Sequence, residues 1–518
     1  MLTPIKAFLL LFYIFAILGV TMLLVPKKKH QINDEHTLRL FTYKDVFVPE
    51  KEEKKDISSV VSTAEQLQQM QTTPEEEAPS PDTTSTDTLD QKEQEKVRIR
   101  KIEEVLKENM RIQFPDGDRS VLASFYGELK KLQEDSSLIR ILHLGDSQIE
   151  GDRITYYLRR KFQQQFGGCG IGLVPVSEPT SSRSTIRNKA SKNWAKHLAY
   201  GPDYVPEHNR NFGLLGSYFS FTPLSVNIPD SIKNAKDTTQ LPDSLVITGD
   251  TTEAWFTYSK PYPKYRKDAA FKELKFLYGL SEKPTSLTVS TPQDTLLSQT
   301  LDPGTAFRKI SIPFDTTFQS VTFHLKSTES PQVYGAAFDC PSGVAVDNVG
   351  LRGSSGTEFV RMNRHNLQAQ LQQMNVKFIL FQFGVNIVPD EKDNYAHLER
   401  WYFSQLRRLK SLAPDMDILV VGVTDMAKKE GEIYKSYPNI EMIRDAQRKA
   451  AFRAGCAFWD LYEAMGGENS MISWVNASPP LAGKDYTHFT IKGADLVAEM
   501  LYNAIILEYE AYKKQTAQ

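Results

Sequence analysis

The chain has 518 residues, of which 40% are hydrophobic and 24% are charged, and its formal net charge is -2. This composition excludes a collagen-like chain, a fully disordered chain and a membrane protein with many spans, and it predicts two to four folded units. The near balance of charge gives no overall field that would favour nucleic acid. Cys169, Cys340 and Cys456 are too few and too scattered for a disulfide framework, and none belongs to a C-x-x-C zinc motif.

An uncharged apolar run from Ala7 to Val25 begins the chain. It is just long enough to cross a hydrocarbon core of about 30 Å, and no small-x-small cleavage site follows it. We therefore predict an uncleaved membrane anchor over residues 1–26, with a cleaved secretory signal as the alternative. Three lysines, residues 27–29, follow the run and would favour a cytoplasmic position for that end, which conflicts with the exported domain expected below.

Residues 27–90 are polar and rich in Pro, Thr, Ser and acidic residues, as in TTPEEEAPSPDTTSTDT. Such a segment cannot bury enough apolar surface to offset its chain entropy, so we predict a disordered tether. Residues 91–172 combine a charged, helical lead-in with the first part of an α/β domain. A strand over residues 138–144 (LIRILHL) ends in Gly145-Asp146-Ser147-Gln148, and an amphipathic helix follows over 151–166.

Residues 173–340 have a different pattern, with short alternating runs such as SLTVST and SVTFHLKS between turn residues. This pattern predicts an all-β sandwich inserted into the α/β domain. Residues 341–518 return to strands followed by helices, with strands expected near 346–351, 376–383, 416–423 and 457–461. Alternating strands and helices predict an α/β fold whose parallel sheet is covered on both faces.

Four groups of residues, each at the end of an expected strand or before a helix, carry the chemistry: Gly145-Asp146-Ser147, Asn348-x-Gly350-x-x-Gly353, Gly384-x-Asn386 and Asp485-x-x-His488. Ser147 is the candidate nucleophile, His488 the base that takes its proton, and Asp485 the carboxylate that orients His488. The backbone N–H groups of Ser147 and Gly353 and the amide of Asn386 are the candidate donors of an oxyanion hole.

Each of these short motifs alone is more typical of a turn or a surface loop than of a catalytic site. The four together, in this order and on matching secondary structure, indicate a serine hydrolase. Two further residues are weaker candidates. Arg153 follows the nucleophile and could contact a substrate, and Trp474 lies in an expected loop before the histidine motif, where it could stack on a sugar.

The four motifs resemble those of the SGNH/GDSL hydrolase family, over residues 119–168 and 345–510. Gly145, Asp146 and Ser147 match the serine block, and Asn348 to Ser355 match the glycine block, so that Gly353 takes the oxyanion role. Gly384-Val385-Asn386 match the asparagine block, although Ile387 stands where the family usually has Asp. Asp485 to His488, followed by FTIKGADLVAEML, match the final block. The resemblance implies a flavodoxin-like three-layer α/β/α fold and hydrolysis of acyl esters.

The stretch GDSQIEGDRIT is also similar to a membrane-anchored subgroup of envelope proteins, some of which carry an inserted carbohydrate-binding β domain and act as glycan O-acetylesterases. This analogy implies an O-acetylated glycan of the cell envelope as the substrate. It implies membrane attachment through the N-terminal helix, a periplasmic or extracytoplasmic catalytic domain and an acyl-transfer machinery of the envelope as a further partner. An O-acetyltransferase using the same triad and a non-catalytic glycan-binding protein are the two alternatives.

No cofactor and no metal are expected, because the chain has no HExxH motif and no clustered His/Cys spacing. The glycine-rich run Gly167-Gly168-Cys169-Gly170-Ile171-Gly172 follows a helix and lacks a Lys-Ser/Thr pair. We therefore interpret it as a flexible loop at the rim of the active site and not as a nucleotide-binding loop.

Overall fold

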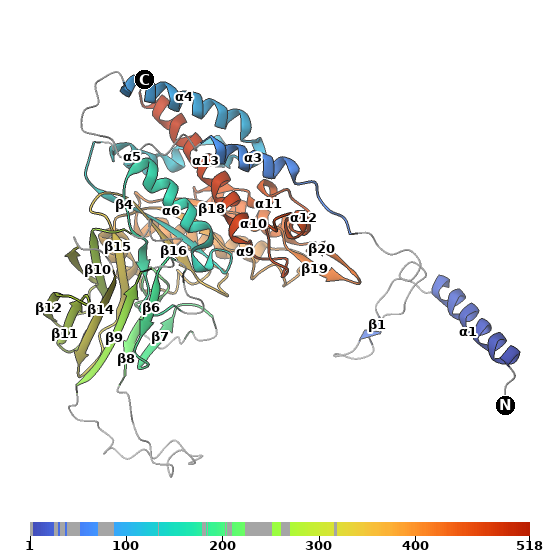
Figure 1. The fold of residues 1–518 in the computed structure, drawn as a ribbon, viewed down its shortest axis with the longest axis horizontal. Helices are drawn as coiled ribbons and strands as arrows, with labels where there is room; N and C mark the ends of the chain where they lie inside the picture. Colours follow the sequence, from blue (N-terminus) through green and yellow to red (C-terminus); the bar gives the residue numbers. More distant parts are fainter. Residues whose placement is uncertain are drawn as a thin grey trace, which may run out of the picture.

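A computed structural model of the chain describes residues 4–24, 30–31, 37–38, 52–70, 87–132, 134–178, 183, 185–201, 204, 210–222, 251–260, 270–314 and 319–517. Figure 1 shows an α/β unit, formed by residues before and after the insertion, with a β unit extending from it. The predicted mixed α/β class is thus confirmed.

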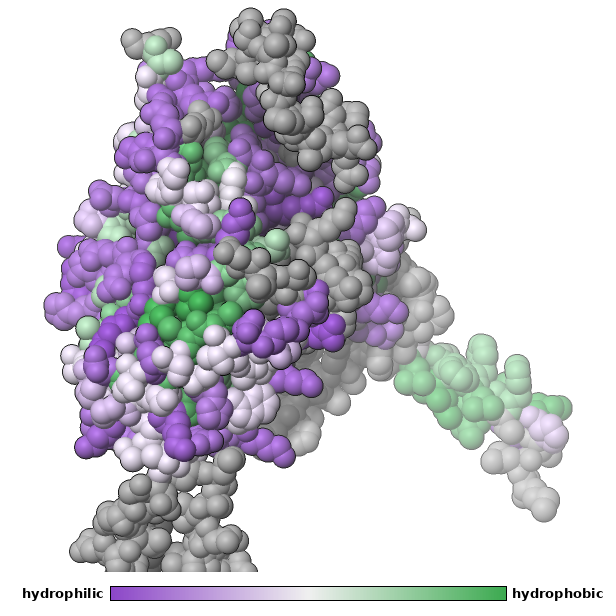
Figure 2. Space-filling view, turned by 60° about the vertical axis from the view of Figure 1, so that its left-hand side comes forward, coloured by the Kyte–Doolittle hydropathy of each residue, from purple (hydrophilic) through white to green (hydrophobic). Residues whose placement is uncertain are grey.

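The N-terminal elements precede β4 in the chain, and one of them, β3, forms an edge strand of the central sheet. They are α1 (Pro4–Leu24), β1 (His30–Gln31), β2 (Thr37–Leu38), α3 (Ser58–Gln69), α4 (Asp87–Val105), η1 (Glu108–Met110), β3 (Ile112–Gln113), η2 (Pro115–Gly117), η3 (Arg119–Leu122) and α5 (Ala123–Lys131). In Figure 2 the visible surface of α1 is apolar, whereas polar and charged residues cover most of the rest. Among the described residues, no helix meets both the length and the apolar character that crossing a bilayer requires. The anchor over residues 1–26 stays a prediction.

The predicted tether over residues 27–90 is wrong in one part. Helix α3 buries Val60, Ala64 and Leu67, which are spaced along one face, and it packs against α13 (Ile491–Gln515). Figure 1 shows α3 and α4 lying beside α13. Residues 39–51 and 71–86, which also belong to the predicted tether, lie outside the described residues.

The central sheet has six strands in the order β16-β4-β17-β18-β21-β3. The first five are parallel, and β3 pairs antiparallel with β21 at one edge. The sheet strands and the helices around them are β4 (Leu138–Gly145), η4 (Glu150–Asp152), α6 (Arg153–Phe166), β16 (Gly343–Gly350), α8 (Arg364–Gln373), β17 (Val376–Gln382), α9 (Ala396–Leu412), β18 (Asp417–Val421), β19 (Ala427–Glu430), β20 (Ile433–Ser436), α10 (Ile440–Arg453), β21 (Ala457–Trp459), α11 (Leu461–Ala464) and α12 (Ser470–Asn476).

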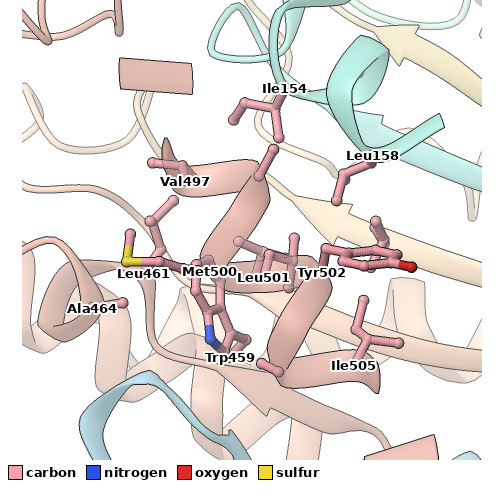
Figure 3. Close-up of a cluster of buried hydrophobic side chains, with 14 of the residues drawn as sticks. Ile154, Leu158, Trp459, Leu461, Ala464, Val497, Met500, Leu501, Tyr502 and Ile505 are labelled. Atoms are coloured by element: carbon pink, nitrogen blue, oxygen red, sulfur yellow. The ribbon is translucent and has the colours of Figure 1, made fainter. Parts of the chain in front are cut away.

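Both faces of this sheet are covered, because its strands are apolar on both sides. Ile139 and Ile141 of β4 pack with α5, α6 and α13 in one cluster, while Leu142 and Leu144 pack with α8, α9 and α10 in another. Figure 3 shows the first cluster, in which side chains of α13 lie between those of α6 and Trp459 of β21. The result is a three-layer α/β/α arrangement.

The inserted unit consists of two antiparallel sheets, ordered β13-β10-β15-β8-β7, with β5 also paired to β15, and β12-β11-β14-β9-β6. Its strands are β5 (Gly172–Val174), β6 (Arg187–Ala190), β7 (Trp194–Leu198), β8 (Ser217–Phe221), β9 (Thr252–Ser259), β10 (Glu273–Tyr278), β11 (Thr285–Ser290), β12 (Thr295–Leu301), β13 (Arg308–Pro313), β14 (Ser320–Ser327) and β15 (Val333–Asp339). Phe256, Phe276 and Phe323 stack between the sheets, with ring centroids 4.7 to 6.5 Å apart. This shared aromatic core makes the unit a β-sandwich.

A disulfide and a buried charge network lie where the sandwich joins the sheet. Cys169, before β5, is bonded to Cys340, after β15, in a disulfide that was not predicted from the sequence; Cys456 is free and buried. Arg140 of β4 pairs with Asp347 at 2.6 Å and with Asp339 at 2.6 Å, and all three side chains are buried. The two units are therefore joined by covalent and ionic contacts.

The glycine-rich run lies at this same junction and not at a flexible rim. A Cβ on Gly170 would collide with the backbone of Phe338, and one on Gly172 would collide with the carboxylate of Asp347. Both glycines have positive φ values, 83° and 72°. Glycine is needed here because the backbone of the run packs directly against β15 and β16.

Candidate active site

The nucleophile turn follows β4 at the carboxyl end of the parallel sheet, where α/β folds place their sites. A Cβ on Gly145 would come within 2.7 Å of the carbonyl oxygen of Gln382, so the strand ends in glycine. The buried Asp146 accepts hydrogen bonds from the backbone N–H groups of Gln148, at 3.0 Å, and of Gly384, at 2.9 Å. Burial raises the pKa of Asp146 to about 6 against the opposing effect of these bonds. Asp146 thus ties the nucleophile turn to the loop after β17.

Ser147, His488 and Asp485 form a continuous chain of hydrogen bonds. The Oγ of Ser147 lies 2.8 Å from Nε2 of His488, and Nδ1 of His488 lies 2.7 Å from Oδ2 of Asp485. Because a carboxylate only accepts, Nδ1–H donates to Asp485 and Nε2 is left to accept the hydroxyl proton of Ser147. This is the arrangement that activates a serine.

Asp485 is held in its ionised form by its own loop. Burial opposes ionisation, but the hydrogen bonds from the His488 ring and from the backbone N–H groups of His488 and Thr487 outweigh it and lower the pKa of Asp485. The two backbone bonds are both 3.1 Å long and reach Oδ1, so Oδ2 is left for the ring. Asp485 lies three residues before His488, so its carboxylate can accept both the backbone N–H groups of the loop and the ring N–H of His488.

Gln148 connects the histidine loop to the nucleophile turn. Its side-chain N–H donates to the carbonyl of Thr487 at 2.8 Å, and its side-chain oxygen accepts from the N–H of Phe489 at 3.1 Å. These two bonds bracket His488 in the sequence and fix its distance from Ser147. This role of Gln148 was not predicted from the sequence, in which Gln148 is recognisable only as a polar residue directly after the nucleophile.

The loop that carries His488 is braced by a neighbouring hairpin. Tyr486 has a φ of 54°, which is unusual for a bulky residue. Its ring stacks on that of Tyr434 of β20, with centroids 3.6 Å apart, and its carbonyl accepts from the N–H of Ala427 in β19. The β19–β20 hairpin therefore supports the turn between Asp485 and His488.

The two remaining oxyanion candidates lie on neighbouring loops. The amide N–H of Asn386 donates to the carbonyl oxygen of Ser354 at 2.8 Å, which places Asn386 against the residue that follows Gly353. Gly353 has a φ of 83°, and a Cβ there would meet nothing within 4 Å, so backbone conformation and not space favours glycine. The roles of Ser147, Gly353 and Asn386 as oxyanion donors stay predictions.

Two weaker candidates have other partners. Arg153 donates to the backbone carbonyls of Ser147, at 2.9 Å, and of Glu150, at 3.1 Å, and so supports the nucleophile turn. Trp474 is fully buried in α12, where its ring N–H donates to the carbonyl of Met465, so it offers no surface for a sugar. Within the described ranges, no group of three or more His, Cys, Asp or Glu side chains is arranged to hold a metal ion.

No family model and no curated protein matches the chain. A solved structure of a peptidoglycan O-acetylesterase is 21% identical to it, covers 78% of this chain and 99% of its own, and has a TM-score of 0.57. A carbohydrate esterase family 3 enzyme from Talaromyces cellulolyticus covers 32% of this chain and 72% of its own, at 17% identity and a TM-score of 0.24. A family two carbohydrate esterase from Clostridium thermocellum covers 50% and 93%, at 11% identity and a TM-score of 0.22. The likeness to the peptidoglycan O-acetylesterase shows a shared fold.

Proposed function

We propose that this chain is a serine esterase that removes O-acetyl groups from a glycan of the cell envelope. One observation carries the proposal: Ser147, His488 and Asp485 are joined by hydrogen bonds of 2.8 and 2.7 Å at the carboxyl end of a parallel sheet. The fold shared with a peptidoglycan O-acetylesterase supports the choice of an acetylated glycan.

The geometry accounts for both halves of ester hydrolysis. The Oγ of Ser147 attacks the acetyl carbonyl carbon while its proton moves to Nε2 of His488, and the carbonyl electron pair moves onto oxygen. Collapse of this intermediate breaks the bond to the sugar oxygen, which takes the proton from His488. Water then attacks the carbonyl carbon of the acetyl group on Ser147 and gives one proton to His488. Collapse of this second intermediate breaks the bond between that carbon and Oγ of Ser147, which takes the proton from His488. The product leaves as acetic acid and ionises to acetate.

The disulfide supports an extracytoplasmic position for the catalytic domain. Disulfides persist in oxidising compartments and are rare where glutathione and thioredoxin keep thiols reduced. The Cys169–Cys340 bond joins the two ends of the sandwich at the junction with the sheet. An envelope glycan would be available to the enzyme in such a compartment.

The test is acetate release from O-acetylated peptidoglycan by the full-length protein beside its Ser147→Ala variant. Release by the first and not by the second is expected. Equal release by both would exclude Ser147 as the nucleophile.

If neither protein releases acetate, hydrolysis of this glycan is contradicted, and both proteins are then given an activated acetyl donor with a deacetylated glycan. Product acetylated only by the unmodified protein would assign the transferase reaction, because the acetyl-serine is then resolved by a sugar hydroxyl in place of water.

A further inference from the structure

A buried carboxylate, Glu358, lies in the loop between β16 and α8 and takes no part in the steps above. Its side chain is 2% exposed. One carboxylate oxygen accepts the hydroxyl of Ser354 at 2.7 Å, and the other accepts the backbone N–H of Thr357 at 2.9 Å. Both carboxylate oxygens therefore accept hydrogen bonds from the same loop. These bonds fix the position of the buried carboxylate.

Ser354 links this carboxylate to the expected oxyanion donors. Because its hydroxyl proton goes to Glu358, its Oγ is free to accept the N–H of Gly356, at 2.9 Å. Its backbone carbonyl accepts one N–H of Asn386 at 2.8 Å, and it directly follows Gly353. Ser354 is thus fixed at both its side chain and its carbonyl.

We infer that Glu358 is a positioning residue of the oxyanion hole, acting through Ser354 on Gly353 and Asn386. An amide nitrogen carries two N–H groups, so the one bonded to Ser354 sets the direction of the other. That second N–H can then point at the oxygen on which charge develops. The inference rests on the proposed function, since it assigns a role in that same site.

The ionised form of Glu358 is the one that holds Ser354 in this way. A protonated carboxyl would carry its own donor and compete with the hydroxyl of Ser354. Arg361 favours the ionised form, and Tyr200 and Tyr402 also interact electrostatically with this carboxylate. Burial raises the pKa of Glu358 to about 6, so the two forms exchange in mildly acidic solution.

The first test replaces Glu358 by Gln. An amide has only one oxygen, so either Ser354 or Thr357 loses its acceptor while the size of the side chain is kept. We expect kcat on a small acetate ester to fall about 10-fold with KM unchanged, because misplaced donors weaken only the transition state. In the native protein, protonation of Glu358 should contribute to the fall of kcat at acid pH. This contribution should be absent in the variant, because its amide does not ionise.

A substrate-independent readout separates this inference from the proposed function. A fluorophosphonate probe phosphonylates an activated serine and places an oxygen where the oxyanion forms. If the native protein is labelled at Ser147 but releases no acetate from glycan, the proposed function fails. The inference about Glu358 can still be tested, because it predicts that Glu358→Gln is labelled more slowly than the native protein. Failure of the native protein to label at all would overturn both proposals.

Two further variants guard against a purely structural effect. Glu499→Gln also removes a fully buried carboxylate, on α13 in the same α/β unit, and should leave kcat, its pH profile and the labelling rate unchanged. Ser354→Ala keeps the carbonyl but loses the link to Glu358, and should reproduce the Glu358→Gln defect without adding to it in the double variant. Unchanged kcat and labelling in both Glu358→Gln and Ser354→Ala would overturn the inference.

Discussion

The two sides of the triad sit in opposite environments. Ser147 is 7% exposed, on a turn fixed by the buried Asp146, whereas the side chains of His488 and Asp485 are 29% and 53% exposed. The nucleophile is therefore placed by the packed sheet, and the base is placed by hydrogen bonds within a surface loop. Loss of a buried group that holds the turn, such as the carboxylate of Asp146, should change stability as well as rate. Substitutions on the exposed side should mainly change rate.

The largest expected effect is that of removing the nucleophile. Ser147→Ala deletes only a hydroxyl and, under the proposed function, should lower kcat by about 10⁴-fold or more. Its thermal unfolding should match that of the native protein, since the hydroxyl bonds only the partly exposed His488. Acetate release and calorimetry check the two parts, and a variant that keeps a tenth of the native rate would contradict the assignment.

The exposed side is tested by Asp485→Asn. The amide cannot stabilise a positively charged His488, so we expect kcat to fall by about 10²- to 10⁴-fold. Because Asp485 is half-exposed, the unfolding temperature should move little. Loss of rate together with a large drop in unfolding temperature would show instead that Asp485 is needed to fold the loop.

The connection between the two sides is tested by Gln148→Leu. This change keeps the side-chain volume but removes both bonds to the loop around His488, and a kcat lower by about 10-fold is expected from the looser geometry. The matched change is Gln370→Leu in α8, because Gln370 is also buried and its side chain also makes two hydrogen bonds to the backbone, with Leu214 and Phe212. This control should keep the native kcat. A native rate in Gln148→Leu would mean that the hairpin contact of Tyr486 alone positions the loop.

The smallest effect on rate, and a clear one on stability, concerns His143 in β4. Its ring is buried between Thr155 and Gln382, and burial lowers its pKa to about 4. The unfolded chain then binds more protons between about pH 6.5 and pH 4, so the contribution of neutral His143 to stability is lost as the pH falls through this window. At pH 4 and below, the resulting loss in the free energy of unfolding is at most about 3 kcal/mol.

Urea unfolding at several pH values measures how steeply the free energy of unfolding changes with pH. This pH dependence of the free energy of unfolding should be weaker in His143→Gln than in the native protein. It should be unchanged in His365→Gln, which alters an exposed histidine. Equal slopes in all three proteins would contradict a buried, neutral His143.

The sequence was informative wherever local patterns decide the structure. Alternating strands and helices predicted the sheet, and the four motifs, taken together in their order, predicted the contacts among Ser147, Asp485 and His488. Helix α3 was missed although Val60, Ala64 and Leu67 have helical spacing, since the residues around them are polar. Contacts that depend on burial could not be predicted: Gln148 and Glu358 look like ordinary surface residues until the fold encloses them.

The bond between Cys169 and Cys340 turns the sandwich into a covalent ring on the α/β unit. Protease cleavage at one point inside that ring would break the backbone without dividing the molecule. Such a nicked protein would migrate as one chain in electrophoresis until a reductant separates it into two. An insertion closed in this way can lose a surface peptide bond and still keep the strands on either side, β4 and β16, attached to one another.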